Sequence, residues 1–288
     1  MEYNKTILVT GANGQLGSEI NFIAKNYPKY NFVFADRNVL SIIDEAAIEL
    51  FFDTHKIDFC INCAAYTAVD KAENEKENAI LANATAVGFL AKACTKYQAK
   101  FIHISTDYVF DGNSTEPYKT DDATNPVNFY GSTKLQGEQI ALQENDEMII
   151  IRTSWVYSSV GNNFVKTMIR LMNERESIGV VNDQYGSPTY AADLAAAIMQ
   201  IITSNKNHKG VYHYSNTGSI SWYDFATEIA AQIKTNCIIN PITTAQFPTP
   251  AKRPSYSVFD KEKITEDFGV EILDWKVSLG KMMEMMGR

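Results

Sequence analysis

The sequence has no apolar run long enough to cross a membrane and no excess of positive charge. Its hydrophobic stretches fall well short of the roughly 20 residues that a spanning helix needs. With 26 Lys and Arg against 34 Asp and Glu, the net charge is −8, so no basic field exists to attract nucleic acid or an anionic membrane. No cationic leader with an apolar core precedes residues 5–10. We therefore expect a cytoplasmic protein that binds small molecules, and neither nucleic acid nor membrane.

Cysteine is also scarce, with four in 288 residues. Cys60 and Cys63 form a C-x-x-C pair that could indicate a redox or zinc half-site. The pair lies in a β-rich segment, where residues three apart point to opposite faces of a sheet. No second C-x-x-C and no His pair completes a zinc site. We interpret this pair as structural.

What the sequence does contain is enough apolar material for a large core, since 45% of its residues are hydrophobic. Its first half alternates β-type segments with helical ones. The expected strands cover residues 7–10, 32–35, 59–64, 101–105 and 148–153, and the expected helices cover 15–26, 45–54, 74–97 and 130–143. Strands separated by helical crossovers predict an α/β fold with a doubly wound, parallel, Rossmann-type sheet.

The second half is richer in turns, at residues 158–163, 182–188 and 241–254, with helices expected over 191–203 and 222–234. We predict a dinucleotide-binding domain over residues 1–155. Residues 156–288 then form a smaller substrate-binding subdomain, interleaved with the last strands of the sheet.

Three glycines at a spacing of three follow the first expected strand and open the first expected helix. The turn reads Gly11, Ala12, Asn13, Gly14, Gln15, Leu16 and Gly17, and this placement is typical of a dinucleotide phosphate site. Asp36 ends the second strand, where a carboxylate binds the adenosine ribose hydroxyls. Arg37 beside it could instead receive a 2′-phosphate, so the residues leave NADH and NADPH both open.

Tyr130 and Lys134 lie four residues apart on an expected helix, hence on one face. Free tyrosine titrates near pH 10. A nearby ammonium and the positive nicotinamide ring would lower the tyrosine pKa toward the range of a general acid. Upstream, Thr106 ends a strand, where its hydroxyl can bond a substrate oxygen as that oxygen gains charge.

These motifs together resemble the extended short-chain dehydrogenases, and longer segments are similar to the dTDP-4-dehydrorhamnose reductase family in particular. The similar segments run through nearly the whole chain and cover residues 64–73, 105–110, 152–157, 182–189 and 248–254. The resemblance implies reduction of the C4 ketone of dTDP-4-dehydro-6-deoxy-L-mannose to dTDP-L-rhamnose, the last step of that sugar's biosynthesis. It implies NADPH or NADH as cofactor and a dTDP-sugar as the binding partner. We expect a monomer or homodimer.

The family's functional residues can be carried onto this sequence position by position. The catalytic set would be Thr106, Tyr130 and Lys134. Cofactor contacts would come from Gln15, Leu16, Asp36, Ser41, Ile42, Ala64, Ala65 and Tyr66, although many relatives have aspartate where Ser41 stands. Thr106 and Asp107 would touch the sugar, and Trp155 would lie against it.

Three further points concern the substrate and a metal. The amide of Asn163 could bind a diphosphate or cap the helix that begins at residue 164. Arg253 lies in a proline-bounded loop, and we expect its guanidinium to bind the substrate diphosphate through two N–H groups. Some relatives bind magnesium through glutamates, but Ala191 and Ala192 stand in the corresponding helix here and only Glu284 lies near the end of the chain. We predict no metal.

Two other functions share these features. A nucleotide-sugar epimerase or 4,6-dehydratase has the same fold and Tyr–Lys pair, but a dehydratase needs a carboxylate pair after the strand-end threonine, and here Asp107 is followed by Tyr108. The second is a non-catalytic binding protein like the regulatory subunit of methionine adenosyltransferase, which resembles the same family. The retained Thr106, Tyr130 and Lys134 favour an enzyme.

Overall fold

The computed structural model describes residues 5–287. Its centre is a six-stranded sheet in the order β10-β5-β4-β3-β1-β2, in which every neighbouring pair is parallel. The strands are β1 (Lys5–Thr10), β2 (Tyr30–Ala35), β3 (Phe59–Asn62), β4 (Lys100–Thr106), β5 (Ile149–Thr153) and β10 (Gly210–Tyr214). This arrangement confirms the predicted doubly wound fold.

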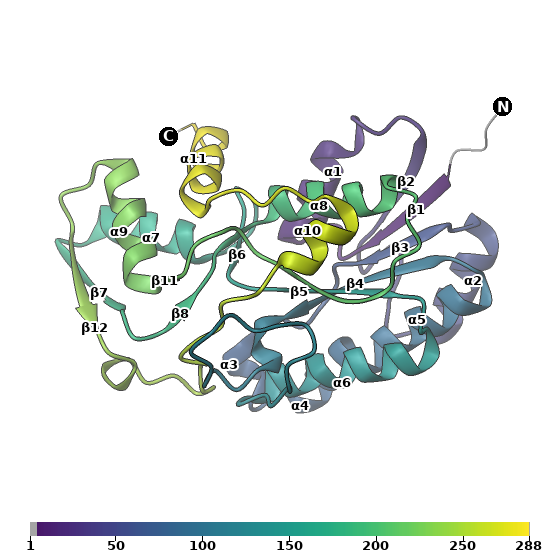
Figure 1. The fold of residues 1–288 in the computed structure, drawn as a ribbon, viewed down its shortest axis with the longest axis horizontal. Coiled ribbons are helices and arrows are strands. Elements are labelled where there is room, and N and C mark those ends of the chain that lie inside the picture. The colour runs from purple at the N-terminus through teal and green to yellow at the C-terminus, as the bar shows by residue number, and fades with distance from the viewer. Residues whose placement is uncertain (1–4, 288) are drawn as a thin grey trace.

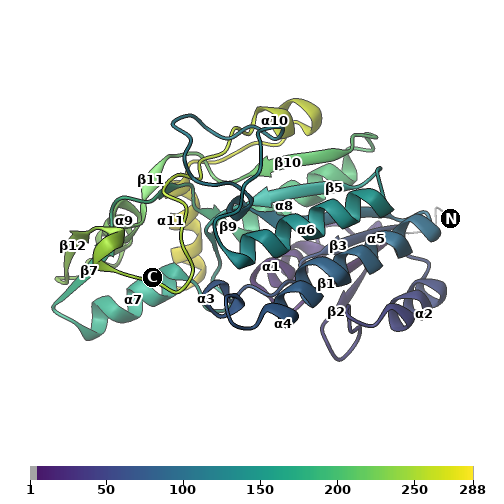
Figure 2. The ribbon, with the colours of Figure 1, turned by 90° about the horizontal axis from the view of Figure 1, so that it is seen from below.

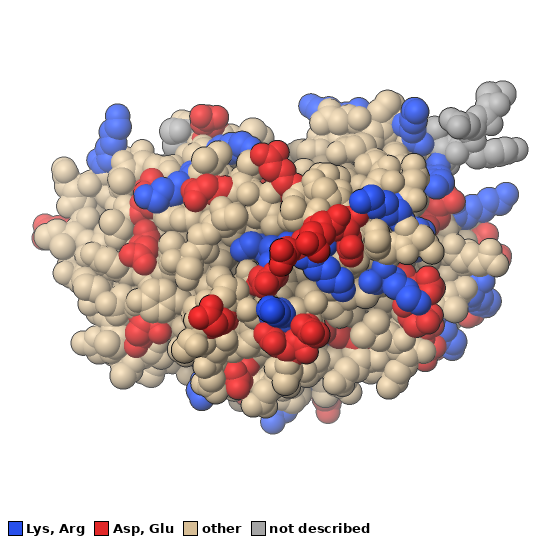
Figure 3. Space-filling view, viewed as in Figure 1, with Lys and Arg blue, Asp and Glu red and all other residues tan. Residues whose placement is uncertain are grey.

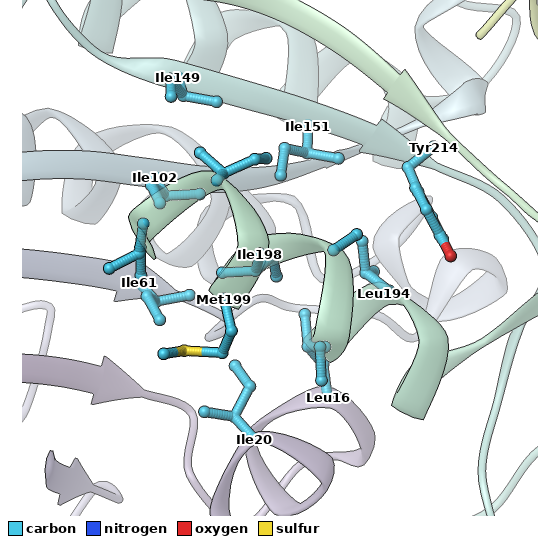
Figure 4. Close-up of a cluster of buried hydrophobic side chains, with 14 of the residues drawn as sticks. Leu16, Ile20, Ile61, Ile102, Ile149, Ile151, Leu194, Ile198, Met199 and Tyr214 are labelled. Carbon is cyan, nitrogen blue, oxygen red and sulfur yellow. The ribbon is translucent and has the colours of Figure 1, made fainter. Parts of the chain in front are cut away.

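Helices cover both faces of this sheet, because successive apolar residues of each strand point to opposite sides. On one face, Ile7 and Val9 belong to a buried cluster that also includes residues of α1 (Gln15–Ala24), α8 (Ala191–Thr203) and α10 (Glu262–Phe268), and Figures 1 and 4 show these helices and part of the cluster. On the other face, Leu8 packs in a cluster with α2 (Glu45–His55), α5 (Ala86–Lys96) and α6 (Phe129–Glu144) (Figure 2).

The helix expected over residues 74–97 contains a wider turn in its middle. It runs through α4 (Lys76–Ile80), one π-helical turn (Leu81–Thr85) and α5, and the short α3 (Val69–Ala72) precedes it. Such π turns place an extra residue in the helix and often lie at functional sites. Asn83, at the centre of this turn, is fully buried.

The second half contributes to both ends of the molecule. Strand β10 belongs to the large sheet, and helix α8 covers one face of that sheet. From the sequence we predicted that this half is interleaved with the last strands, but not which segments take part. Most of the remainder, apart from α10, forms a smaller lobe around α7 (Phe164–Glu174), α9 (Trp222–Ile233) and α11 (Trp275–Met285) (Figure 1). Its two-stranded pairs are β6 (Val156–Tyr157) with β9 (Thr189–Tyr190), β8 (Tyr185–Gly186) with β11 (Ile220–Ser221), and β7 (Ser177–Val181) with β12 (Ile238–Ile242).

The face shown in Figure 3 agrees with the absence of a basic field. Acidic and basic side chains lie next to one another, several acidic side chains adjoin near the centre, and no large basic area is visible. Within residues 5–287, none of the helices combines the length and the apolar character needed to cross a membrane.

Candidate active site

The predicted site residues gather at one edge of the sheet. Strands β1, β3, β4 and β5 are neighbours and run in the same direction, so their carboxyl ends meet there. The glycine turn follows β1, residues 63–66 follow β3, Thr106 ends β4, and Ser154 and Trp155 follow β5. Open parallel sheets bind ligands at this edge.

The turn after β1 is shaped by close backbone approaches. Gly11 has a φ of +65°, and a Cβ there would lie 2.6 Å from the backbone nitrogen of Ala64. A Cβ on Gly17 would lie 2.5 Å from the Gly11 carbonyl oxygen. Gly14 begins α1 without a side-chain cap, so the first N–H groups of the helix stay available for an anion. The turn therefore fits a dinucleotide pyrophosphate.

Asp36 is held as a carboxylate at the end of β2. It accepts hydrogen bonds from the backbone N–H groups of Asn38 (2.9 Å) and Val39 (3.1 Å) and from the Asn13 amide (3.0 Å). The bonds from Asn38 and Val39 are the main cause that lowers the Asp36 pKa. Arg37 is exposed and makes no ion pair with the described residues. Ser41 and Ile42 follow in a half-buried turn.

Two buried asparagines, Asn62 and Asn83, hold the backbone of residues 64–66 by hydrogen bonds. Asn62 accepts a hydrogen bond from the Ala64 N–H at 3.2 Å. Asn83 accepts from the Tyr66 N–H at 2.8 Å and donates to the Tyr66 carbonyl at 3.0 Å. The half-buried Ala64, Ala65 and Tyr66 therefore form a rigid wall beside Gly11. We did not predict a role for Asn83 from the sequence, because nothing in a helical pattern marks a π turn.

The helix α6 presents Tyr130 and Lys134 from its first two turns. Asn128 caps it by accepting from the Gly131 N–H at 2.8 Å. A Cβ on Gly131 would lie 2.1 Å from the Tyr108 carbonyl oxygen, so glycine lets the helix approach the end of β4. The Tyr130 ring packs edge-on against Tyr108, with ring centroids 5.7 Å apart.

The pKa of Tyr130 differs from the sequence prediction. Burial raises the pKa of Tyr130 to about 12, and contact with the Thr106 hydroxyl acts in the opposite direction. The lowering expected from the Lys134 ammonium stays a prediction, and in the structure Nζ bonds the Ile104 carbonyl at 2.7 Å. The contribution expected from the nicotinamide ring stays a prediction.

Lys134 is 2% exposed. Burial lowers the pKa of Lys134 to about 8, against the opposing effects of Glu138 and Cys63. Its second neighbour is His103 on β4, whose Nε2 lies 3.4 Å from Nζ. The sequence missed His103, because a histidine inside an apolar strand carries no signal of its own.

Thr106 and Asp107 lie together at the end of β4. The Thr106 hydroxyl donates to Asp107 Oδ1 at 3.0 Å and accepts from the Tyr108 N–H at 3.3 Å. Burial raises the pKa of Asp107 to about 6. Its Oδ2 is buried without a hydrogen bond of good geometry among the described residues, although the nearby Ser257 hydroxyl acts to lower the Asp107 pKa. An unpaired buried carboxylate oxygen is costly, so Asp107 is well suited to accept from a ligand hydroxyl.

Trp155 enters the site in an unusual conformation. Its φ is +48°, which is rare for a bulky residue and common at functional sites. Its ring is half-buried and stacks on Trp222, with centroids 3.5 Å apart and planes 10° apart. Phe164 packs on the same Trp222 ring at 4.6 Å. Trp222, which the sequence did not single out, therefore supports one face of Trp155.

Asn163 and Arg253 already have partners in the protein. Asn163 caps α7 by accepting from the Lys166 N–H at 3.1 Å, and its amide nitrogen donates to Gln15 Oε1 at 3.0 Å. Arg253 is not a free surface arginine, because its guanidinium pairs with Asp70 at 2.8 Å. A diphosphate would have to share or replace these partners, so their substrate contacts stay predictions.

Cys60 and Cys63 lie in different hydrophobic clusters, one on each face of the sheet. Cys60 and Cys94 are buried, Cys63 and Cys237 are half-buried, and all four are free thiols. Within residues 5–287, no cluster of three or more His, Cys, Asp or Glu side chains has the geometry to hold a metal ion.

The parallel sheet, the glycine turn and the set of Thr106, Tyr130 and Lys134 at its carboxyl edge define a dinucleotide-binding protein of the extended short-chain dehydrogenase type. The chain belongs to the family described as the RmlD substrate binding domain, which matches residues 5–287. The resemblance seen in the sequence is thereby confirmed.

Named relatives extend this result over almost the whole chain. The dTDP-4-dehydrorhamnose reductase of Aggregatibacter actinomycetemcomitans is 40% identical, with 95% of this chain and 96% of that protein covered. The crystal structure of a dTDP-4-dehydrorhamnose reductase from Clostridium acetobutylicum is 41% identical and has a TM-score of 0.95, covering 98% of this chain and 100% of that chain. That of Bacillus anthracis, in complex with NADP, is 38% identical, with a TM-score of 0.94 and coverage of 98% and 99%.

Proposed function

We propose that this protein is an NAD(P)H-dependent oxidoreductase that reduces the C4 ketone of dTDP-4-dehydrorhamnose to dTDP-L-rhamnose, the final step of dTDP-rhamnose biosynthesis. The observation that carries the proposal is the buried set of Thr106, Tyr130 and Lys134 beside a glycine turn fit for pyrophosphate. Its support is that relatives 40% and 41% identical bear the name of this reductase.

The nicotinamide, when bound, would supply the hydride to the ketone carbon. The side chains of the protein would bind the substrate carbonyl oxygen and protonate it. The Thr106 hydroxyl would turn from Asp107 to the substrate carbonyl oxygen, and Tyr130 would give its phenolic proton to that oxygen as it becomes an alkoxide. The raised pKa of Tyr130 keeps the phenol protonated at neutral pH.

Lys134 and Asp107 complete the set. As an ammonium, Lys134 would stabilise the phenolate that Tyr130 leaves behind. Asp107, with one unpaired oxygen, would accept a hydrogen bond from a sugar hydroxyl. Trp155 would pack its indole face on the C–H surface of the deoxysugar.

The proposal is tested by mixing the protein with NADPH and dTDP-4-dehydrorhamnose and following the loss of reduced-nicotinamide absorbance. The matched control is a 4-keto sugar on a different nucleotide, such as the GDP-linked analogue. Rapid loss with the dTDP-sugar and little with the analogue supports the proposal. Cofactor binding without turnover would instead favour a non-catalytic binding protein.

Cofactor choice is proposed to be broad, because Asp36 repels a 2′-phosphate while the adjacent Arg37 attracts it. Asp36 is already bonded by Asn13, and Arg37 is exposed. We expect NADH and NADPH to support turnover within about 100-fold, or about 2.7 kcal/mol. A larger difference would show that only one of the two side chains reaches the cofactor.

The cytoplasmic location and the state of monomer or homodimer stay predictions. Cell fractionation tests the location, and analytical ultracentrifugation tests the oligomeric state.

A further inference from the structure

A line of buried polar side chains leads to Lys134 of the proposed catalytic pair, and the mechanism above uses no other member of this line. It consists of Thr10 on β1, Asn62 on β3, His103 on β4 and Lys134 on α6. The Thr10 hydroxyl bonds Asn62 Oδ1 at 2.6 Å, Asn62 Nδ2 lies 3.1 Å from His103 Nδ1, and His103 Nε2 lies 3.4 Å from Lys134 Nζ. Thr10, Asn62 and His103 are each 0% exposed.

The orientation of the Asn62 amide is fixed by its neighbours. The backbone N–H of Ala64 donates to Asn62 Oδ1 at 3.2 Å. Because a backbone N–H can only donate, the atom that it meets must be the amide oxygen, and the amide nitrogen must be the atom facing His103.

This orientation also fixes the proton on His103. The Asn62 NH₂ group is a donor only, so the His103 Nδ1 opposite it has to accept. A neutral imidazole that accepts at Nδ1 carries its proton on Nε2. The atom that His103 turns toward Lys134 is therefore a donor N–H.

The Nε2–H of His103 points at Lys134 Nζ, where an ammonium would need a hydrogen-bond acceptor instead of a second donor. Of the described residues, only the Ile104 carbonyl and His103 lie within hydrogen-bonding distance of Nζ. An amine fits both neighbours, since it donates one N–H to Ile104 and accepts from Nε2–H with its lone pair. An ammonium has no lone pair and would face the Nε2 proton directly.

We infer that His103 is a positioning residue whose Nε2–H, fixed by Asn62, disfavours the ammonium form of Lys134 and so sets the pH range over which Lys134 keeps its proton. The inference rests on the proposed reduction only for its effect on turnover. The other ionisable groups that face Lys134 are Cys63 after β3 and Glu138 on α6, and Glu138 is already paired with Arg152 of β5 at 2.8 Å.

The first test is a measurement on the unmodified protein that needs no turnover. The chain has four histidines, and ¹⁵N NMR of histidine-labelled protein distinguishes a protonated ring nitrogen from an unprotonated one. We expect His103 to be neutral with its proton on Nε2, and its Nε2 resonance to move with a midpoint near the Lys134 pKa of about 8. A proton on Nδ1, an imidazolium, or a resonance that does not move overturns the inference.

The second test is the pH profile of kcat/KM for His103→Gln, which also assigns the His103 resonances by their loss. A glutamine amide can turn its oxygen to an ammonium, so the Lys134 pKa should rise. The alkaline limb should then move to higher pH by about 0.5 to 1 unit, the shift that one hydrogen bond of ordinary strength produces.

The matched control is His213→Gln, because His213 is also buried but bonds the Tyr118 carbonyl. It should leave the alkaline limb in place. An equal shift in both variants, or none in His103→Gln, contradicts the inference. If His103→Gln does not fold, the NMR result on the unmodified protein decides. If the protein does not reduce the proposed sugar, the NMR measurement still tests the inference about His103, because it needs no turnover.

Discussion

At the scale of single residues, the account depends most on Tyr130. The variant Tyr130→Phe keeps the ring that packs on Tyr108 and removes only the phenolic proton. Loss of a general acid lowers turnover on the order of 100- to 10,000-fold. Steady-state kinetics should show this loss, while NADPH titration should give a nearly unchanged Kd. Retention of more than about a third of the turnover would mean that another group supplies the proton.

Trp155 gives a second prediction at this scale. Trp155→Ala should raise KM for the sugar or lower kcat through misplacement, because the indole face opposite Trp222 is the expected sugar platform. NADPH affinity and melting temperature should stay near those of the unmodified protein.

The control for Trp155 is another tryptophan, Trp275, which is 5% exposed in the core of the smaller lobe. Trp275→Ala should lower stability by about 3–5 kcal/mol. If Trp155→Ala showed the same thermal loss with normal kinetics per folded molecule, Trp155 would be a core residue and no part of the sugar subsite.

Much of the site at this scale could be predicted from the sequence, because motif spacing reports on local geometry. Tyr130 and Lys134 share a helix face, and the glycines of the turn after β1 lie where the sequence placed them. The contacts of His103, Trp222, Asn83 and Asp70 could not be predicted. Each depends on a partner 17 to 183 residues away along the chain, and no local pattern encodes such a pairing.

At the scale of elements, the packing of α6 on the π-helical turn positions the proposed catalytic pair. A Cβ on Gly137 would lie 2.0 Å from the Asn83 carbonyl oxygen. Asn83 in turn bonds Thr133 at 3.1 Å and holds Tyr66. The two helices therefore meet through backbone at Gly137, and any added atom has to move one of them.

Gly137→Ala should destabilise the protein by about 1–3 kcal/mol through overpacking and should lower turnover, since Lys134 lies one turn away. Chemical denaturation and kinetics measure the two effects. Gly280→Ala in α11 is the control, because a Cβ there meets nothing within 4 Å. It should be neutral or stabilising by up to about 1 kcal/mol. Equal behaviour of the two variants would contradict the close approach at Gly137.

The elements of the large sheet were mostly predictable, whereas those of the smaller lobe were not. Five strands and their crossover helices follow from apolar runs bounded by turns. The pairs β6 with β9 and β8 with β11 are two residues long and join distant segments, so they leave no periodicity to detect. The edge strand β10 was missed because it follows directly on a polar loop within the turn-rich half.

At the scale of the whole molecule, α1 joins the sheet to the start of the smaller lobe. The carboxyl of Glu19 accepts from the Ser158 hydroxyl at 2.6 Å. Gln15 reaches the Val156 carbonyl at 3.4 Å and accepts from Asn163. The helix whose amino end is expected to meet the cofactor is therefore bonded to the segment expected to meet the substrate.

Burial raises the pKa of Glu19 above its ordinary value of 4.5. The folded protein thus binds this proton more tightly than the unfolded chain does. The resulting stability is fully present below pH 4.5 and is lost as the pH rises through the folded-state pKa. Glu19→Gln should therefore be more stable than the unmodified protein at neutral pH, and the difference should shrink toward pH 4.5.

Melting temperatures across this pH range test the prediction for Glu19. Glu271→Gln serves as the control, because Glu271 is exposed and its loss should not alter the pH dependence. A difference between Glu19→Gln and the unmodified protein that stays constant with pH would mean that Glu19 has no raised pKa in solution.

The proposed reaction transfers a hydride from the nicotinamide to C4 of the dTDP-linked sugar, and an isotope label follows that transfer. NADPH carrying deuterium at both C4 positions would be incubated with the protein and dTDP-4-dehydrorhamnose, and the product analysed by NMR and mass spectrometry. We expect dTDP-L-rhamnose with one deuterium at C4 of the sugar, and very little of it with Tyr130→Phe. Deuterium at another carbon, or cofactor oxidation without a labelled sugar, would contradict it.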